Sequence, residues 1–171
     1  MFGGIRNMGT PDGALAGRGA RARRSAAGFT LIELLIVVAI IGLIAAIAIP
    51  NLMSALNKAK QTKTMADIKA IGSALETYAV DNNTYPKGLG DANAQVLGQY
   101  LSRYLKTIPP GDGWNNPWHV DTNSAGTVYT ITSYGADGAS GTDPGGPTTD
   151  FKSDIIYTNS SFYQWPQGAQ Q

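Results

Sequence analysis

The hydrophobic and polar positions of this chain divide it into stretches of different character. The 21 residues from Phe29 to Ile49 carry a single charge, that of Glu33. A helix of this length spans the roughly 30 Å hydrocarbon core of a bilayer at about 1.5 Å per residue. Over residues 51–80 the apolar residues recur at steps of three or four, the spacing of an amphipathic helix. We therefore expect one long helix with a membrane-spanning half at 29–50 and an amphipathic half at 51–80.

Turn formers and prolines mark the ends of elements further along the chain. Pro50 lacks a backbone donor, so the long helix is expected to kink near it without ending. The run Asp-Asn-Asn-Thr-Tyr-Pro at 81–86 is expected to end the helix. Apolar residues at helical spacing then predict a second, short helix within 91–106.

The last third of the chain has the composition of strands and loops. Residues 127–133 read TVYTITS and residues 154–158 read DIIYT, which predicts two or three antiparallel strands. Gly, Asp, Pro and Thr dominate 135–150, which predicts a long loop of the kind that is functional or mobile. The expected fold class is α+β, with the long N-terminal helix packed on a small antiparallel sheet and 81–171 forming the globular region.

Residues 1–28 precede the apolar run and contain five arginines against one acid. They have no sustained apolar period, so we interpret them as a disordered leader. The arginines predict a cytoplasmic N-terminus, although Lys58, Lys60 and Lys63 on the other side of the span oppose that orientation. A cleavable secretory signal is the alternative, but the apolar run exceeds the roughly 7 to 15 residues of such a signal.

Charge and composition exclude several classes of function. From Phe29 onward the chain has eight basic and eleven acidic residues, a net charge of −3, so we expect no nucleic-acid partner. The absence of cysteine removes disulfides, thiolate metal sites and a cysteine nucleophile. With a single histidine, His119, and no Gly-x-Ser-x-Gly motif, the chain offers little to a membrane-tethered hydrolase. We expect a protein that is not an enzyme.

The junction between leader and apolar run carries the most specific motif. It reads RSAAGFTLIELL from Arg24 to Leu35. This string resembles the processing site of type IV prepilins and type II secretion pseudopilins. The resemblance implies a type IV pilin-like fold, cleavage between Gly28 and Phe29 by a prepilin peptidase, and N-methylation of Phe29. Glycine before the cut suits a peptidase that approaches the backbone closely, because no side chain obstructs it.

Glu33 is the charge within the apolar half of the helix. A carboxylate at the bilayer centre costs about 2.5 to 3.5 kcal/mol, and less near the interface. Cleavage after Gly28 creates an α-amino cation on Phe29, which can neutralise Glu33 of a neighbouring subunit in a helical array. Glu33 is therefore our candidate assembly residue. In the alternative interpretation, Glu33 is simply solvated among the lipid headgroups.

The resemblance continues, with substitutions, into the second half of the chain. The stretch DGWNNPW at 112–118 and the loop YGADG at 134–138 are similar to the major pseudopilin of type II secretion systems. The family motif reads Asp-Pro-Trp-Gly-Asn-Pro-Tyr, so Gly113, Asn115 and Trp118 depart from it. The resemblance implies a structural subunit that polymerises into a periplasmic filament and drives folded proteins across the outer membrane.

The same resemblance implies partners and a location. The implied partners are further copies of the chain, the prepilin peptidase and methyltransferase, minor pseudopilins, the inner-membrane assembly platform, and lipid before assembly. The implied location is the bacterial inner membrane, crossed once, with the C-terminal domain in the periplasm and the assembled filament in the periplasm or on the cell surface. The alternative is a major or minor pilin of a surface type IV pilus. The absence of cysteine favours the pseudopilin, because a C-terminal disulfide loop is common in pilins.

A calcium site is also implied by the resemblance. In the family, the Gly-Ala-Asp-Gly loop and an aspartate before a terminal strand bind one Ca²⁺. The matching groups here are the side chains of Asp137 and Asp154 and the backbone carbonyls of Tyr134 and Ala136. Calcium takes six to eight oxygen ligands from flexible loops, so the composition of this loop suits it.

The chain departs from the family near the second aspartate. The family has a further acidic residue there, where this chain has Lys152 and Ser153, and the loop is longer. Asp143 and Asp150 are the candidates to replace that acid. In the alternative interpretation, Asp137 caps a turn, as aspartate before glycine commonly does, and the second aspartate is a strand-edge charge.

Overall fold

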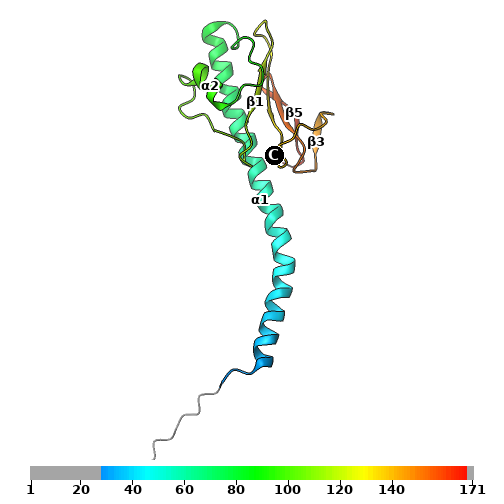
Figure 1. The fold of residues 1–171 in the computed structure, drawn as a ribbon. Coiled ribbons are helices and arrows are strands. Elements are labelled where there is room, and N and C mark those ends of the chain that lie inside the picture. Colours follow the sequence, from blue (N-terminus) through cyan, green and yellow to red (C-terminus); the bar gives the residue numbers. More distant parts are fainter. Residues whose placement is uncertain (1–27, 169–171) are drawn as a thin grey trace, which may run out of the picture. The chain divides into compact units, whose positions relative to one another are not determined.

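The computed structural model describes residues 28–168 (Figure 1). Its elements are, in order, α1 (Leu31–Asn82), α2 (Ala94–Leu101), β1 (His119–Thr122), β2 (Tyr129–Ser133), β3 (Gly146–Thr148), β4 (Ile155–Thr158) and β5 (Ser161–Pro166). Apart from Gly28, the predicted leader at 1–28 lies outside the described residues. The chain divides between Ile41 and Gly42 into two compact units, and all elements except the beginning of α1 belong to the second unit.

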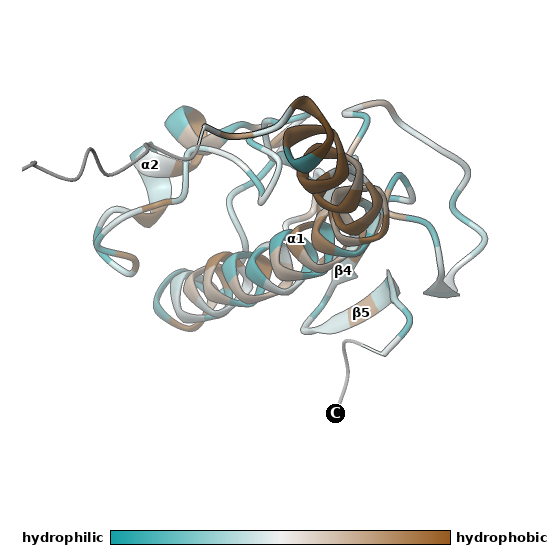
Figure 2. Ribbon diagram, turned by 90° about the horizontal axis from the view of Figure 1, so that it is seen from below, coloured by the Kyte–Doolittle hydropathy of each residue, from teal (hydrophilic) through white to brown (hydrophobic). Residues whose placement is uncertain are grey.

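Helix α1 confirms the predicted long helix. It runs without a break through Pro50 and ends at Asn82. Hydrophobic residues surround its first half, whereas hydrophilic and hydrophobic residues alternate in its second half (Figure 2). Its buried residues begin only at Gln61. The first half is long and apolar enough to cross a membrane and contains no buried residue, which fits a membrane anchor.

In the second unit, α1 packs against the sheet and against α2 (Figure 1). The buried face of α1 contributes Ile68, Ile71 and Leu75, and α2 contributes Leu97 and Leu101. The sheet supplies further fully buried side chains, namely Val120, Tyr129, Ile131 and Ile155. These residues form one continuous core, which confirms the α+β, pilin-like arrangement.

The sheet is larger than predicted. It has five strands in the order β1-β2-β4-β5-β3. The predicted strands correspond to β2 and β4, which pair antiparallel, with Ile131 opposite Tyr157. The expectation of two or three antiparallel strands was wrong in number and in one direction, because β3 pairs parallel to β5. Strand β3 also lies within the stretch 135–150, which was expected to be loop throughout.

Helix α2 is shorter than the predicted range of 91–106. It begins after Asn93, whose side-chain oxygen accepts hydrogen bonds from the N–H groups of Gln95 and Val96 and so caps the helix. It ends at Leu101, although apolar residues continue at helical spacing. The N–H groups of Tyr104 and Leu105 both donate to the carbonyl of Leu101, so this segment packs on the core as a turn.

Candidate functional site

The predicted processing site lies directly before α1. Phe29 is 81% exposed, and no described atom beyond the adjacent residues lies within 4 Å of the position where a side chain on Gly28 would begin. The peptide bond between these two residues therefore has open space around it, as a peptidase requires. No described contact tests cleavage or methylation, so both stay predictions.

Glu33 has a partner within its own chain. Its Oε2 accepts hydrogen bonds of 2.8 Å from both the backbone N–H and the hydroxyl of Thr30, and the N–H of Glu33 donates to the Thr30 hydroxyl oxygen at 3.2 Å. This reciprocal arrangement is a capping box, in which the first free donors of a helix find acceptors. Sequence reasoning missed it, although a threonine three residues before a glutamate is its usual signal.

The capping box changes the interpretation of Glu33. The carboxylate is hydrogen-bonded in a single chain, so it has a local role at the helix start besides any role between subunits. Only one of its two oxygens accepts these bonds, however. The other oxygen and the charge are left for a cation such as the amine that cleavage would create on Phe29.

Asp154 is the most deeply buried of the predicted calcium ligands. Its side chain lies just before β4, and the residue is 1% exposed. Oδ2 accepts a hydrogen bond of 3.0 Å from the N–H of Gly141. Oδ1 is buried without a hydrogen-bond partner, which is unusual for a carboxylate oxygen and is expected to cost free energy.

The surroundings of Asp154 favour its protonated form. Burial raises the pKa of this carboxyl group above its usual range, while the N–H of Gly141 acts in the opposite direction. The negative charges of Asp143 and, more weakly, of Asp137 raise the pKa further. The loop therefore brings the charges of Asp143 and Asp137 near a buried carboxyl group.

The remaining predicted ligands occupy a turn. Asp137 is exposed, and its Oδ1 accepts a hydrogen bond of 3.2 Å from the N–H of Ala139, as the turn-capping interpretation expects. Tyr134 and Ala136 flank Gly135, which has a φ of +64°, a conformation that suits glycine. Because Gly135 has no side chain, the backbone of Lys152 can approach it closely. Within residues 28–168 no three acidic or histidine side chains converge as a metal cluster, so backbone carbonyls would have to contribute.

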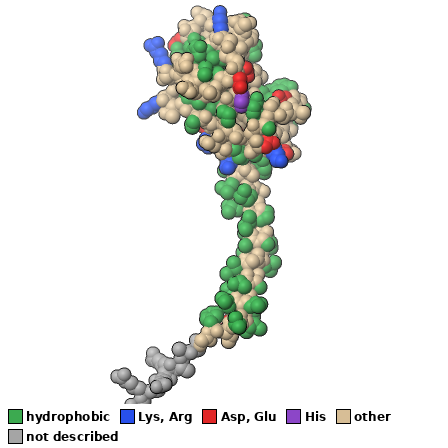
Figure 3. Space-filling model, viewed as in Figure 1, with side chains coloured by type: hydrophobic (Ala, Val, Ile, Leu, Met, Phe, Trp, Pro, Cys, Tyr) green, Lys and Arg blue, Asp and Glu red, His purple; other side chains and the backbone are tan. Residues whose placement is uncertain are grey.

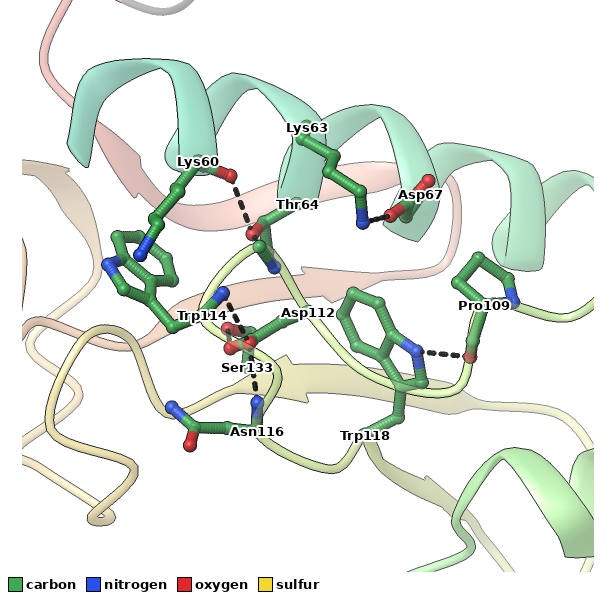
Figure 4. Close-up of polar contacts among 11 residues, drawn as sticks. Lys60, Lys63, Thr64, Asp67, Pro109, Asp112, Trp114, Asn116, Trp118 and Ser133 are labelled. Carbon is green, nitrogen blue, oxygen red and sulfur yellow. Dashed lines mark hydrogen bonds and ion pairs between the residues drawn. The ribbon is translucent and has the colours of Figure 1, made fainter. Parts of the chain in front are cut away.

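A second buried aspartate escaped the sequence analysis. Asp112 is 4% exposed and accepts three hydrogen bonds (Figure 4). Its Oδ1 accepts from the backbone N–H groups of Trp114 at 2.9 Å and Asn116 at 2.8 Å. Its Oδ2 accepts from the hydroxyl of Ser133 at 2.6 Å. The carboxylate thus shapes the loop 111–118 and joins it to β2, a role for which the sequence carries no signal beyond the family motif.

The loop 111–118 also packs against α1. The N–H of Gly113 donates to the hydroxyl of Thr64 at 2.9 Å, and the indole N–H of Trp114 donates to Asn57 at 3.1 Å. A side chain on Gly113 would begin 2.3 Å from the carbonyl oxygen of Lys60, closer than atoms can approach. This contact explains why glycine suits this position, where the family motif has proline.

A long exposed apolar helix that begins at Leu31, within the string Gly-Phe-Thr-Leu-Ile-Glu, and continues into a small α+β domain defines the class of type IV pilin-like subunits. Comparison with known families agrees: residues 23–49 match the prokaryotic N-terminal methylation motif, and residues 51–152 match type II secretion system (T2SS), protein G. The chain belongs to the type II secretion system protein G family, whose members are pseudopilins.

Individual relatives support this placement. The type II secretion system core protein G of Pseudomonas aeruginosa is 39% identical over 128 residues, which cover 70% of this chain and 89% of the relative. The core protein G of Aeromonas hydrophila is 36% identical over 130 residues, covering 71% and 90%. That of Escherichia coli K12 is 35% identical over 132 residues, covering 72% and 90%. The pseudopilin interpretation is thereby favoured over the surface pilin.

Proposed function

We propose that this chain is a filament subunit, with no catalytic role, of a type II secretion system. It is inserted into the inner membrane as a precursor, cut after Gly28, methylated on Phe29, and polymerised with further copies into a periplasmic pseudopilus. Growth of that filament drives folded proteins across the outer membrane. Family membership supports this sequence of events, because the methylation motif implies processing by a prepilin peptidase.

The observation that carries the proposal is the surface of α1. Every residue from Leu31 to Leu56 is exposed except Ala45, which is half-buried. Figure 3 shows the hydrophobic side chains on this helix surface. Exposure of an apolar surface of this length to water is unfavourable. Lipid must therefore cover it before assembly, and neighbouring helices must cover it afterwards. A helix that exchanges one apolar environment for another is suited to reversible insertion into a helical filament.

Orientation and the remaining partners follow from the same proposal. The arginine-rich leader holds the N-terminus in the cytoplasm, so the domain from residue 81 onward lies in the periplasm. The prepilin peptidase meets the chain at Gly28, and the inner-membrane assembly platform and minor pseudopilins meet it during polymerisation. The net charge of −3 after the leader supports a protein partner and not a nucleic acid.

The absence of cysteine allows a direct test. We would introduce Ile36→Cys and Leu43→Cys together in the exposed apolar helix and oxidise intact cells that express the complete secretion operon. Neighbouring helices in a filament should give a ladder of disulfide-linked oligomers, and the same cells should export their secreted proteins. Single-cysteine variants should stop at dimers.

The matched control is the same double variant in cells that lack the prepilin peptidase, where no ladder should form. Deletion of the gene for this chain, in cells with no second copy, should stop secretion. Intact secretion after that deletion would contradict the secretion proposal. A ladder on the cell surface without any secretion defect would instead favour the surface pilus.

We also propose that the loop before β4 binds calcium. The side chains of Asp137 and Asp154 and the carbonyls of Tyr134 and Ala136 would hold the ion, which would supply positive charge to a loop rich in acids. The unpartnered Oδ1 of Asp154 supports the proposal, because a cation would complete its surroundings. The pKa of the same group is raised first by burial and then by the charges of Asp143 and Asp137, and a cation would offset both effects.

The structure favours Asp143 over Asp150 as the replacement for the missing family acid. Asp143 interacts with Asp154 closely enough to raise its pKa. Asp150 is not among the groups that raise the pKa of Asp154, and it accepts a hydrogen bond of 3.0 Å from the N–H of Lys152. We therefore assign the additional carboxylate to the longer loop of this chain.

A further inference from the structure

Strand β5 (Ser161–Pro166) lies after residue 152, where the match to the protein G family ends. It pairs antiparallel to β4 and parallel to β3, so it sits between these two strands. Strand β5 joins β3 to the sheet. Strand β3 lies within the segment 135–154, which carries Asp137, Asp143 and Asp154 and is here named the aspartate loop. The loop is therefore held at its far end by a strand outside the matched segment.

One side chain of β5 reaches into the base of the loop. Gln164 is fully buried, with 0% of its surface exposed. Its Nε2 donates a hydrogen bond of 2.9 Å to the backbone carbonyl of Asp154. Its Oε1 accepts a hydrogen bond of 3.2 Å from the N–H of Gly145. A single amide thus joins Gly145 to Asp154, two points of the loop that lie on either side of Asp150 in the sequence.

The same region has a second point of attachment. The N–H of Gly141 donates to Oδ2 of Asp154, and the ring of Tyr163 lies against Gly145, leaving no room there for a larger residue. Gln164 fixes the backbone of Asp154, while Gly141 fixes its side chain. The position of the buried carboxylate therefore depends on contacts that the chain makes with itself.

We propose that Gln164 is a positioning residue, through which β5 holds the loop 141–154 closed and sets the orientation of Asp154. Buried amides with both groups hydrogen-bonded define one geometry, because any other arrangement leaves polar atoms unpaired. This chain has Ser153 where the family motif has a further acid, and the hydrogen bonds of Gln164 help to close the loop beside that position.

The closure itself is independent of calcium, whereas its effect on ion affinity rests on the calcium proposal above. The test uses the full processed chain in detergent micelles, in chelator, and measures amide hydrogen exchange by mass spectrometry. We would compare Gln164→Met, which removes both polar groups at similar volume, with Ser161→Ala, an exposed control on the same strand. A peptide covering 139–146 reports on the loop, and one covering 66–76 reports on α1.

We expect Gln164→Met to speed exchange in the loop peptide about tenfold or more, since two buried partners lose their hydrogen bonds, with little change in the α1 peptide. Ser161→Ala should match wild type. Gln164→Leu also lacks both polar groups, so it should likewise speed exchange in the loop and serves if Gln164→Met does not fold. Unchanged exchange in the loop would overturn the proposal, as would equal acceleration in both peptides.

Ion affinity provides the second readout. Where the wild-type chain binds calcium, Gln164→Met should raise the dissociation constant for calcium about 10-fold to 100-fold. This is the usual effect of removing a group that orients a metal ligand. If Gln164→Met bound calcium with the wild-type affinity, the proposal that Gln164 sets the orientation of Asp154 would be overturned. A wild-type chain that binds no calcium would contradict the calcium proposal alone, because exchange in chelator decides the closure by itself.

Discussion

The side-chain amide of Asn116 donates a hydrogen bond of 2.7 Å to the backbone carbonyl of Gly135. Asn116 belongs to the loop that rests on α1, and Gly135 opens the loop that carries the candidate calcium ligands. The backbone N–H of Asn116 also donates to Asp112. A short series of hydrogen bonds therefore connects the aspartate loop to the helix that enters the filament.

Asp112 is the centre of this series, so its removal should be costly. We expect Asp112→Ala to lower the free energy of unfolding by about 3 kcal/mol or more, because three donors, one buried and two partly buried, lose their acceptor. Ser133→Ala removes one donor and should cost about 1 to 2 kcal/mol. Urea unfolding followed by tryptophan fluorescence measures both. Equal losses in the two variants would show that Asp112 does not organise the loop.

The mature chain should begin at an N-methylated Phe29. Gly28 and Phe29 are accessible in front of the helix, and the string that follows matches the methylation motif. Intact-mass measurement on protein extracted from membranes checks both modifications. Gly28→Leu should block cleavage, because a large side chain would obstruct the peptidase. Retention of residues 1–28 by the wild-type chain in cells with an active peptidase would disprove the processing step.

Glu33 should be needed for polymerisation and dispensable for insertion. Glu33→Ala removes a carboxylate from the apolar helix, so insertion should become easier, while filaments should disappear because the Phe29 amine loses its partner. Glu33→Gln separates two explanations, since its amide oxygen can still accept the bonds from Thr30 without the charge. Electron microscopy of sheared filaments measures the outcome. Abundant filaments from Glu33→Gln would mean that the helix cap matters and the charge does not.

Calcium should stabilise the domain. An ion present at a hundredfold excess over its dissociation constant adds about 2.7 kcal/mol, or several degrees in melting temperature for a domain of this size. We expect this shift for the wild-type chain in millimolar calcium relative to chelator, and its loss in Asp137→Asn and Asp154→Asn. Asp143→Asn should reduce the shift, and Asp150→Asn should retain it as the matched control. A wild-type shift below about one degree would remove the site.

Alkaline pH should destabilise the domain through Tyr85. Burial, together with a hydrogen bond of 3.0 Å from the tyrosine hydroxyl to Glu76, raises the pKa of Tyr85 to about 12. An unfolded tyrosine titrates near 10, so the folded state holds this proton more tightly. The resulting stability is present below about pH 10 and is lost as the pH rises toward 12. Tyrosinate absorbance measures it, and Tyr85→Phe should reduce the late step by one tyrosine, because the pKa values of Tyr129 and Tyr157 are raised as well. Ionisation of Tyr85 near pH 10 in the folded protein would contradict the prediction.

Elements with a strong periodic pattern were predictable from the sequence. Helix α1 follows from an apolar run joined to an amphipathic one, and β2 and β4 follow from β-branched residues. Strands β1, β3 and β5 were missed: β1 and β3 are three or four residues long and read HVDT and GPT, and β5 reads SFYQWP and ends at a proline. The parallel pairing of β3 with β5 depends on tertiary contacts that no local pattern encodes.

The site residues divide in a similar way. Gly28, Phe29, Glu33, Asp137 and Asp154 were predicted as site residues from motifs, which record spacing, and they stay predictions. Asp112 and Gln164 were not found as site residues, because their importance comes from burial and from partners elsewhere in the chain. Composition cannot distinguish a buried amide or carboxylate from the many exposed ones.

The two outer strands of the sheet have a consequence for crowded subunits. Strand β1 is covered on its free side by Ala92, which exchanges two backbone hydrogen bonds with Val120. Strand β3, at the opposite edge, is three residues long and contains Pro147, which has no N–H to offer. Exposed strand edges invite chains to join side by side into insoluble aggregates, and short or proline-containing edges prevent this. The domain can therefore be packed at high local density without competing, off-pathway association through its sheet.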